Sequence, residues 1–320
     1  MCAMWGEHRD HEHTSPKNIV NAALTLLICA PSVLWVLGTR RKCDDLSSAD
    51  SLECTLYRRH PNALLHLLFF ANVSLGFWVV GLIQKSFWLI DPYWTLFPPL
   101  AVLFYATRYE SEDSSQLRVA ALLLVVWSLR LTYSYFRRER WKFGEREDWR
   151  YTDMARKWGG HWWWMSFFAV GLAQQFMLCP LVYPFYVITA RAEPWSFWDT
   201  AATFGSAIGI GISWAADGQL HEYCKTPKGK KAPVLSTGLW RYSRHPNYVG
   251  EQIWWWSLAL FGLRRDWWAV SGALINSLVL AHVTTLTEDH MLSTWTRTRI
   301  KEYRKYAKVT PAWVIKFNDS

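Results

Sequence analysis

Long apolar runs separated by charged loops are the feature that most constrains the fold of this chain. Runs of membrane length lie at roughly 18–38, 63–83, 87–106, 117–136, 162–189, 197–216, 252–263 and 267–287. Lipid offers the backbone no hydrogen-bond partners, so such runs cross a bilayer as helices. We therefore expect an all-α, polytopic membrane helical bundle with about seven or eight transmembrane helices.

Two details of these runs predict more of the fold. The last two runs are short or close together, and residues 262–266 between them are typical of a tight turn, so we expect a C-terminal helical hairpin. Pro98, Pro99, Pro180 and Pro184 lie inside apolar runs, where proline kinks or breaks a helix.

The distribution of charge predicts which loops face the cytosol. The chain carries a net charge of +9 and 23 tryptophans, and tryptophan favours the membrane interface. The loops at 137–160 and 217–250 and the tail from 288 are rich in Lys and Arg, so we place them on the cytosolic side. This count puts residues 40–42 (Arg-Arg-Lys) on the other side, against the same rule. Either the first run does not cross fully, or the number of spans differs by one.

Several classes of function find no support in the sequence. The six cysteines are scattered and form no Cys-Xaa-Xaa-Cys pair, which predicts neither a zinc or other metal site nor a disulfide framework. No nucleotide-binding glycine pattern, P-loop or nucleophile elbow occurs. The arginines alternate with apolar runs rather than forming a nucleic-acid motif, so we expect no nucleic-acid partner.

The segment 235–251 concentrates polar, cationic and aromatic side chains immediately before an apolar run. The guanidinium groups of Arg241 and Arg244 suit phosphate oxygens. The same segment contributes His245, Asn247, Tyr248 and Glu251. The two arginines alone are also typical of the positive flank of a membrane helix. The remaining residues favour a binding site for a phosphate-bearing cofactor.

Two further segments contain candidate cofactor-binding residues. Arg150, in the loop 137–156, is interleaved with aromatic residues; the loop is either a surface helix with charge pairs or a phosphate-binding site. Asp217 and Gln219 suit ribose or amide contacts, and Lys225 suits a phosphate. Asp217 is equally suited to a role at a helix end.

Asp91 and Tyr93 are the candidate proton donors. They lie in the string Asp-Pro-Tyr-Trp at the start of an apolar run. Asp-Pro is also a helix-start signal, with Asp as the cap and Pro at the first helical position. The alternative is a desolvated carboxyl whose raised pKa lets it donate a proton, or the Tyr93 hydroxyl in the same role.

These motifs resemble those of a known family. The string Arg-His-Pro-Asn-Tyr-Val-Gly-Glu at 244–251, Asp-Pro-Tyr-Trp at 91–94, Glu-Asp-Trp-Arg-Tyr at 147–151, Ala-Asp-Gly-Gln at 216–219 and the tail 288–311 are similar to the steroid 5-alpha-reductase-like membrane proteins, most closely their DUF1295 branch. The resemblance covers about residues 63–315, which we expect to form the membrane domain. Residues 1–17 are expected to be a disordered polar terminus, and 18–62 a membrane segment with a loop.

The resemblance implies a multi-pass membrane enzyme, expected in the endoplasmic reticulum. It implies an oxidoreductase that uses NADPH to reduce an activated carbon–carbon double bond in a lipid or steroid-like substrate. Related isoprenylcysteine methyltransferases use S-adenosylmethionine, which is the first alternative. A non-catalytic lipid-binding protein is the second. The many arginines favour a dinucleotide with phosphates over S-adenosylmethionine, which has none.

Overall fold

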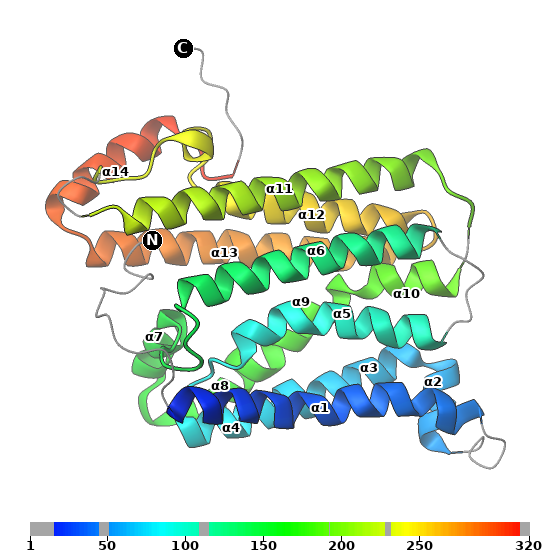
Figure 1. Cartoon of the computed structure of the whole chain (residues 1–320). Helices are drawn as coiled ribbons and strands as arrows, with labels where there is room; N and C mark the ends of the chain where they lie inside the picture. Colours follow the sequence, from blue (N-terminus) through cyan, green and yellow to red (C-terminus); the bar gives the residue numbers. More distant parts are fainter. Residues whose placement is uncertain (1–15, 45–50, 109–114, 192, 228–231, 314–320) are drawn as a thin grey trace. The chain divides into compact units, whose positions relative to one another are not determined.

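The structure, a computed structural model, describes residues 16–44, 51–108, 115–191, 193–227 and 232–313. Within these ranges every regular element is a helix (Figure 1), which confirms the all-α class. The expected disordered terminus at 1–17 lies outside the described residues as far as residue 15. The helices divide between an N-terminal unit (Asp10–Trp195 with Gly262–Gly272) and a C-terminal unit (Ser196–Phe261 with Ala273–Ser320).

Besides two short 3₁₀ turns (Gly159–His161 and Trp267–Val270), the N-terminal unit contains twelve described helices. They are α1 (Pro16–Asp44), α2 (Leu52–Arg59), α3 (Pro61–Phe69), a π-helix (Phe70–Phe77), α4 (Trp78–Gln84), α5 (Ile90–Arg108), α6 (Ser115–Arg138), α7 (Trp149–Trp158), α8 (Trp162–Ser166), a second π-helix (Phe167–Leu172), α9 (Ala173–Leu181) and α10 (Tyr183–Ala190). Helix α5 packs against α1, α6 and α10. Its buried side chains, with those of α3 and the first π-helix, form an aromatic core.

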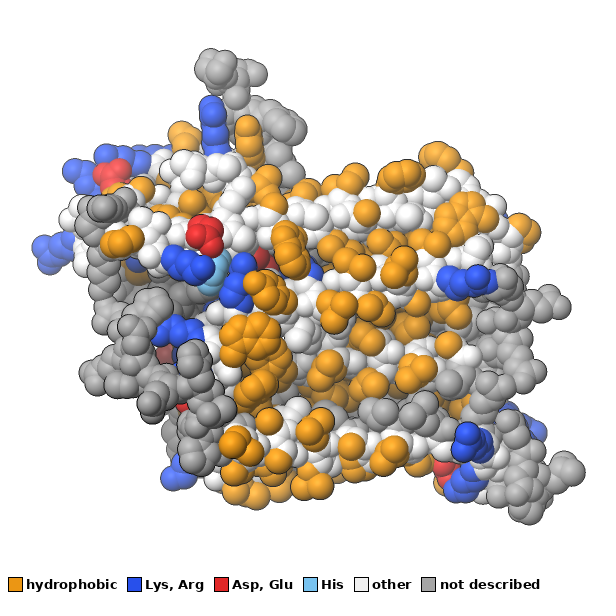
Figure 2. All heavy atoms as spheres, viewed as in Figure 1, with side chains coloured by type: hydrophobic (Ala, Val, Ile, Leu, Met, Phe, Trp, Pro, Cys, Tyr) orange, Lys and Arg blue, Asp and Glu red, His pale blue; other side chains and the backbone are white. Residues whose placement is uncertain are grey.

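Four helical stretches among the described residues are long and apolar enough to cross a membrane. They are Pro61–Gln84, Ser115–Arg138, Trp149–Ala190 and Trp267–Thr294. Figure 2 shows apolar side chains along α1, α6 and α11, with Lys and Arg gathered near helix ends. Large apolar side chains of α6, such as Leu122 and Leu129, are each 65% exposed, as expected for a surface that faces lipid. The chain is therefore an integral membrane protein by composition and helix length.

The predicted proline breaks are found in one region and not in the other. Helix α9 ends at Leu181 and α10 begins at Tyr183, so Pro180 and Pro184 flank a break. Pro98 and Pro99 instead lie inside the continuous helix α5. Pro99 has no N–H to donate to the carbonyl of Thr95, four residues earlier. The Ser128 hydroxyl of α6 donates to that carbonyl at 2.7 Å, which satisfies the freed oxygen.

The C-terminal unit is built from α11 (Phe197–Lys225), a 3₁₀ turn (Gly238–Arg241), α12 (Pro246–Leu263), α13 (Ser271–Thr294) and α14 (Arg297–Val309). The indole of Trp256 on α12 donates to the Ser277 hydroxyl on α13 at 3.0 Å. The turn between them carries backbone bonds from Arg265 and Asp266 to the carbonyl of Gly262. The expected C-terminal hairpin is therefore present.

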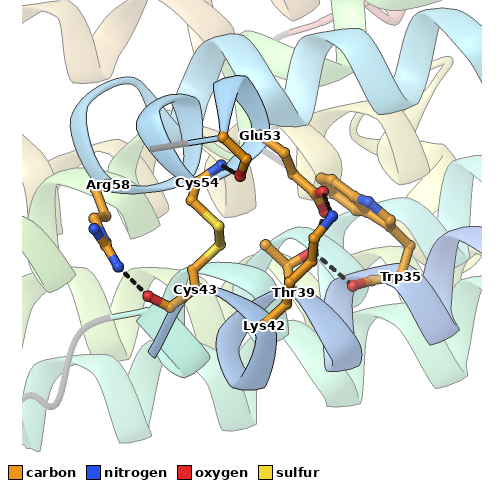
Figure 3. Close-up of a disulfide and its surroundings, with 8 residues drawn as sticks. Trp35, Thr39, Lys42, Cys43, Glu53, Cys54 and Arg58 are labelled. Carbon is orange, nitrogen blue, oxygen red and sulfur yellow. Dashed lines mark hydrogen bonds and ion pairs between the residues drawn. A yellow bond between two sulfur atoms is a disulfide. The ribbon is translucent and has the colours of Figure 1, made fainter. Parts of the chain in front are cut away.

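The expectation that the cysteines form no disulfide is wrong. Cys43, near the end of α1, is bonded to Cys54 in the first turn of α2 (Figure 3). The two cysteines are eleven residues apart, and no short-range spacing marks them as a pair. The packing of α1 against α2 brings them together.

Candidate functional site

In the N-terminal unit, charged residues after α6 form a connected network. Glu139 accepts from Arg138 at 3.0 Å and from Arg146 at 2.6 Å. The Glu147 carboxylate accepts from the backbone N–H of Phe87 at 2.7 Å and of Asp148 at 3.1 Å. The loop 139–148 is thereby fixed to the segment that leads into α5.

Gly144 lets this loop pack closely against α1. It has a φ of +64°, and a Cβ there would lie 2.4 Å from the Asn21 amide nitrogen and 2.6 Å from the Trp88 ring. The same Asn21 amide donates to the carbonyl of Phe143 at 2.8 Å. The start of α1, the loop and residues 84–88 therefore form one packed corner.

Asp148 and Arg150 form a bidentate pair at the start of α7. The Asp148 carboxylate caps the helix by accepting from the Arg150 backbone N–H at 2.8 Å. It also accepts from Arg150 Nε at 2.8 Å and Nη2 at 2.7 Å. Burial opposes ionisation of Asp148, but the hydrogen bonds from Arg150 prevail and lower its pKa. Much of the donor capacity of Arg150 is thus used within the chain.

Asp91 lies in the first turn of α5, outside the four candidate spans. The helix begins one residue earlier, at Ile90, so Asp91 is inside the helix and does not occupy the cap position. Burial, together with the negative charge of Asp148, raises the pKa of Asp91 to about 7, against the opposing charges of Arg150 and Arg138. At neutral pH a substantial fraction of this carboxyl is protonated and able to donate.

Tyr93 lies in a different environment from Asp91. Its side chain is 5% exposed, and its ring packs against Phe69, Phe77 and Phe97 with centroid distances of 5.9, 5.1 and 6.0 Å. The ring belongs to the aromatic core of the N-terminal unit. A core role accounts for its position as well as a catalytic one does.

In the C-terminal unit, Arg244 ties the motif to α13 and to the tail. Its Nε and Nη2 donate to the Glu288 carboxylate at 2.9 and 3.1 Å. Its Nη1 donates to the carbonyls of Ala307 at 3.3 Å and Thr310 at 2.8 Å. Arg244 therefore holds the end of α14 against the segment that precedes α12.

His245 is buried next to Arg244 and contacts the same Glu288 carboxylate. The imidazole is 2% exposed, its Nε2 lies 2.9 Å from Glu288 Oε1, and its ring stacks on Tyr248 at 5.2 Å. Burial lowers the pKa of His245, although the hydrogen bond to Glu288 acts in the opposite direction. The neutral ring with its proton on Nε2 then donates to the carboxylate.

The remaining predicted residues lie around the same motif. The Asn247 amide donates to Asp217 at 3.2 Å, and Gln219 accepts from the backbone N–H of Leu239 at 3.0 Å. Gly238, before Leu239, has a φ of +61°, and a Cβ there would lie 2.6 Å from Gln219. A side chain at Gly238 would therefore disrupt this contact between the motif and α11.

Three predicted residues are less enclosed. Arg241 is exposed, and Lys225 is exposed with only a 3.5 Å contact to Glu222. Glu251, in the first part of α12, is half-buried. Arg241 and Lys225, unlike Arg150 and Arg244, present their positive charge to solvent, where an anionic ligand can reach it.

The structure thus brings Arg244, His245, Asn247 and Tyr248 together with Asp217 and Gln219 in the C-terminal unit. In the N-terminal unit it places Asp91 close enough to Arg150 for the guanidinium charge to act on the pKa of Asp91. Sequence reasoning did not assign Asp148 or Glu288. Glu288 carried a usable signal, because it is an ionisable residue at the end of a membrane-length apolar run. Among the described residues no group of three or more His, Cys, Asp or Glu side chains is placed to hold a metal ion.

Comparison with known proteins places these residues in a family context. Residues 77–310 match the family described as "Protein of unknown function (DUF1295)". An uncharacterized protein of Schizosaccharomyces pombe (strain 972) is 31% identical over 229 residues. That match covers 64% of each protein, so the chain spans just under two-thirds of the length of this relative. No solved structure matches the chain.

Proposed function

The chain belongs to the DUF1295 family, and we propose that it is a membrane-embedded reductase. It uses NADPH to reduce an activated carbon–carbon double bond in a lipid or steroid-like substrate, for example an enone. The cofactor supplies the hydride, and the protein supplies orientation, an apolar environment and an acid. The acid donates to the carbonyl oxygen of the enone, on which negative charge develops.

The observation that carries this proposal is the environment of Asp91. Reduction of an enone near neutral pH needs a group that is protonated at that pH and can still release its proton. A pKa of about 7 gives Asp91 both properties. Asp91 lies inside the first turn of α5 and not at the cap position, so the helix start does not need its carboxylate as a cap. Burial is the main cause of this raised pKa, and the nearby charges of Asp148 and Arg150 act on it in opposite directions.

The cofactor contacts are assigned to the C-terminal unit. The exposed cations Arg241 and Lys225 suit the phosphates, including a 2′-phosphate, which distinguishes NADPH from NADH. Asp217, Gln219 and Asn247 suit hydroxyl and amide groups. The polar atoms of Arg244 and His245 are hydrogen-bonded to Glu288. We therefore propose that these two residues position the cofactor-binding residues.

Thermal unfolding of the detergent-purified chain tests the proposal. A ligand that binds the native state raises the melting temperature by mass action. We expect protection by NADPH, less by NADH, and none by S-adenosylmethionine. Protection by S-adenosylmethionine alone would identify a methyltransferase instead. Protection by none of the three would favour a non-catalytic lipid-binding protein.

Two arginine variants separate direct from indirect contacts. Arg241→Ala is expected to weaken NADPH binding about ten-fold or more, since hydrogen bonds to charged groups contribute about 1.5–3 kcal/mol. The melting temperature without ligand should not change. Arg244→Ala is expected to weaken binding and also to lower that melting temperature. Arg297→Ala, which removes another exposed cation of the same unit, is the matched control.

The acid is tested by variants that retain binding. Asp91→Asn should still be protected by NADPH but should lose NADPH oxidation with a steroid enone as the probe. Tyr93→Phe removes only the hydroxyl and tests the alternative donor. If both variants oxidise NADPH at the wild-type rate, the acid lies elsewhere in the chain.

A further inference from the structure

Helix α14, the last described helix of the C-terminal unit, carries a row of cations on one face. Successive members are four, three and four residues apart, a spacing that brings side chains to the same side of a helix. Each of the four is exposed, and none has a hydrogen-bond or ion-pair partner among the described residues. We call this row the basic stripe. Its members are Arg297, Lys301, Arg304 and Lys308.

The opposite face of α14 is attached to the rest of the C-terminal unit. Tyr303 is 4% exposed, and the Tyr306 hydroxyl donates to the carbonyl of Ser243 at 3.2 Å. The guanidinium of Arg299 is used on this face too, because its Nε donates to the carbonyl of Pro233 at 2.9 Å. A cation with a partner in the chain thus lies on the attached face, whereas the basic stripe is open to a partner outside the chain.

The start of α14 lies at the surface of the membrane. The candidate span Trp267–Thr294 has 28 residues, which rise about 42 Å as a helix. A bilayer with its headgroup regions is about 40–45 Å thick. Only Trp295 and Thr296 separate this span from the first residue of α14. The connection therefore places the start of the basic stripe close to the lipid headgroups.

The end of α14 is held near the same depth. After α13 the chain turns back, so α14 does not continue into water along the axis of α13 (Figure 1). The carbonyls of Ala307 and Thr310 accept from Arg244 at 3.3 and 2.8 Å, and Arg244 also donates to Glu288 of α13 at 2.9 Å. Glu288 precedes the end of α13 by six residues, which is about 9 Å along the helix toward the bilayer. Both ends of the basic stripe are thus close to the headgroup layer.

Clusters of Lys and Arg beside a membrane helix bind anionic lipids. We propose that the basic stripe binds the phosphate groups of anionic phospholipids in the leaflet that borders α14. The side chains of Lys and Arg are long enough to reach headgroups from a helix at the membrane surface. Phosphatidylcholine offers the same phosphate together with a compensating choline cation, so the stripe should bind it less well.

Lipid bound to the basic stripe also stabilises the motif 241–251. Arg244 of this motif joins the end of α14 to Glu288, so α14 and the motif are held by one set of contacts. A ligand that binds only the native state raises its stability by mass action. The stripe contains none of the proposed cofactor-binding residues, so lipid binding requires neither NADPH nor a particular orientation of the chain.

Melting temperatures of the full chain in lipid nanodiscs, without cofactor, test this proposal. One set of discs contains phosphatidylcholine alone, and the other contains a mixture with phosphatidylserine. Wild type should melt about 3 °C or more higher in the mixed discs. Salt at about 1 M shortens the Debye length to about 3 Å and should remove most of this gain. No gain in wild type, or a gain that salt leaves unchanged, would overturn the proposal.

Variants of equal charge separate the basic stripe from net charge. Changing all four stripe residues to Gln, also a good helix former, should leave the melting temperature in phosphatidylcholine unchanged and remove about half or more of the gain in the mixed discs. If that variant does not fold, Lys301→Gln with Arg304→Gln should remove a smaller part of the gain. Equal losses in the stripe variant and the control would overturn the assignment to the stripe. The control removes four exposed cations at scattered positions of the N-terminal unit and should keep the gain: Arg41→Gln, Arg59→Gln, Lys85→Gln and Lys157→Gln.

Inorganic phosphate distinguishes a lipid headgroup from a free anion. Added to wild type in phosphatidylcholine discs, it should not raise the melting temperature, because a free ion lacks the fixed position of a headgroup beside α14. A rise as large as that given by phosphatidylserine would show that the stripe takes phosphate from solution, and the lipid assignment would be wrong. Wild type recovered from mixed micelles should also retain more phosphatidylserine, relative to phosphatidylcholine, than the stripe variant does.

Discussion

Glu288 accepts hydrogen bonds from both Arg244 and His245, so one carboxylate supports the motif 241–251 from α13. Removing it leaves a partly buried guanidinium and a buried imidazole without their shared acceptor. Loss of one partner from a buried ion pair costs about 3–5 kcal/mol. The Arg244 and Glu288 side chains are 16% and 19% exposed, so solvent reduces this cost.

We predict that Glu288→Ala lowers the free energy of unfolding by about 2–4 kcal/mol, measured by thermal or denaturant unfolding in detergent. Glu302→Ala is the control, because Glu302 forms an exposed ion pair with Lys305 on α14. That variant should change stability by about 1 kcal/mol or less. Equal effects of the two substitutions would show that the Glu288 network adds nothing beyond a surface pair.

At the scale of residues, the sequence predicted which segments hold charge but not how each donor is used. Arg241 and Arg244 are equivalent in the motif as written. The fold places Arg241 in solvent and engages Arg244 with Glu288 and two backbone carbonyls. That difference depends on the return of the tail after α14, more than 60 residues along the chain. No local pattern encodes it.

At the scale of elements, small residues set the packing of α11 on α12. Gly205 and Gly209 follow one another at a spacing of four, which brings both to one face of α11. A Cβ at Gly209 would lie 2.5 Å from the backbone nitrogen of Trp254 and 2.7 Å from the carbonyl of Gly250. Such close approach of backbones is how small residues pack membrane helices.

We predict that Gly209→Ala destabilises the chain, because the added methyl meets backbone atoms that can move only if the helices separate. Overpacking of this kind typically costs about 1–3 kcal/mol. Gly211→Ala is the matched control on the same helix, since a Cβ there meets no atom within 4 Å. It should be neutral or stabilising by up to about 1 kcal/mol through helix propensity. Melting temperatures in one detergent distinguish the two, and equal shifts would contradict the predicted close contact.

Apolar runs and turn residues predicted the helices and the α12–α13 hairpin, since both follow from local sequence. The continuity of α5 through Pro98 and Pro99 was not predictable in the same way. It depends on the Ser128 hydroxyl of α6, which satisfies the carbonyl that Pro99 leaves free. The small face of α11 was readable from the Gly-Xaa-Xaa-Xaa-Gly spacing, although its partner helix was not.

At the scale of the whole molecule, the two units carry titrating groups whose effects on stability oppose each other. The pKa of His245 is lowered in the folded state, so its contribution is lost as pH falls below the unfolded value of about 6.5. The pKa of Asp91 is raised to about 7 from an unfolded value near 3.8. The folded chain therefore holds a proton that the unfolded chain has released, and stability falls as pH rises between these values.

Comparison of wild type with Asp91→Asn isolates the Asp91 term, because His245 contributes equally to both proteins. Asn stays neutral at every pH and removes the cost of ionising a buried carboxyl. We predict that the melting temperature of Asp91→Asn, minus that of wild type, increases as pH rises from 5 to about 7 and levels off above it. Thermal unfolding in detergent across this range measures the difference. A difference that stays constant from pH 5 to 8 would mean that Asp91 titrates as it does in the unfolded chain, and a carboxyl of that kind is almost fully ionised at neutral pH and a poor proton donor.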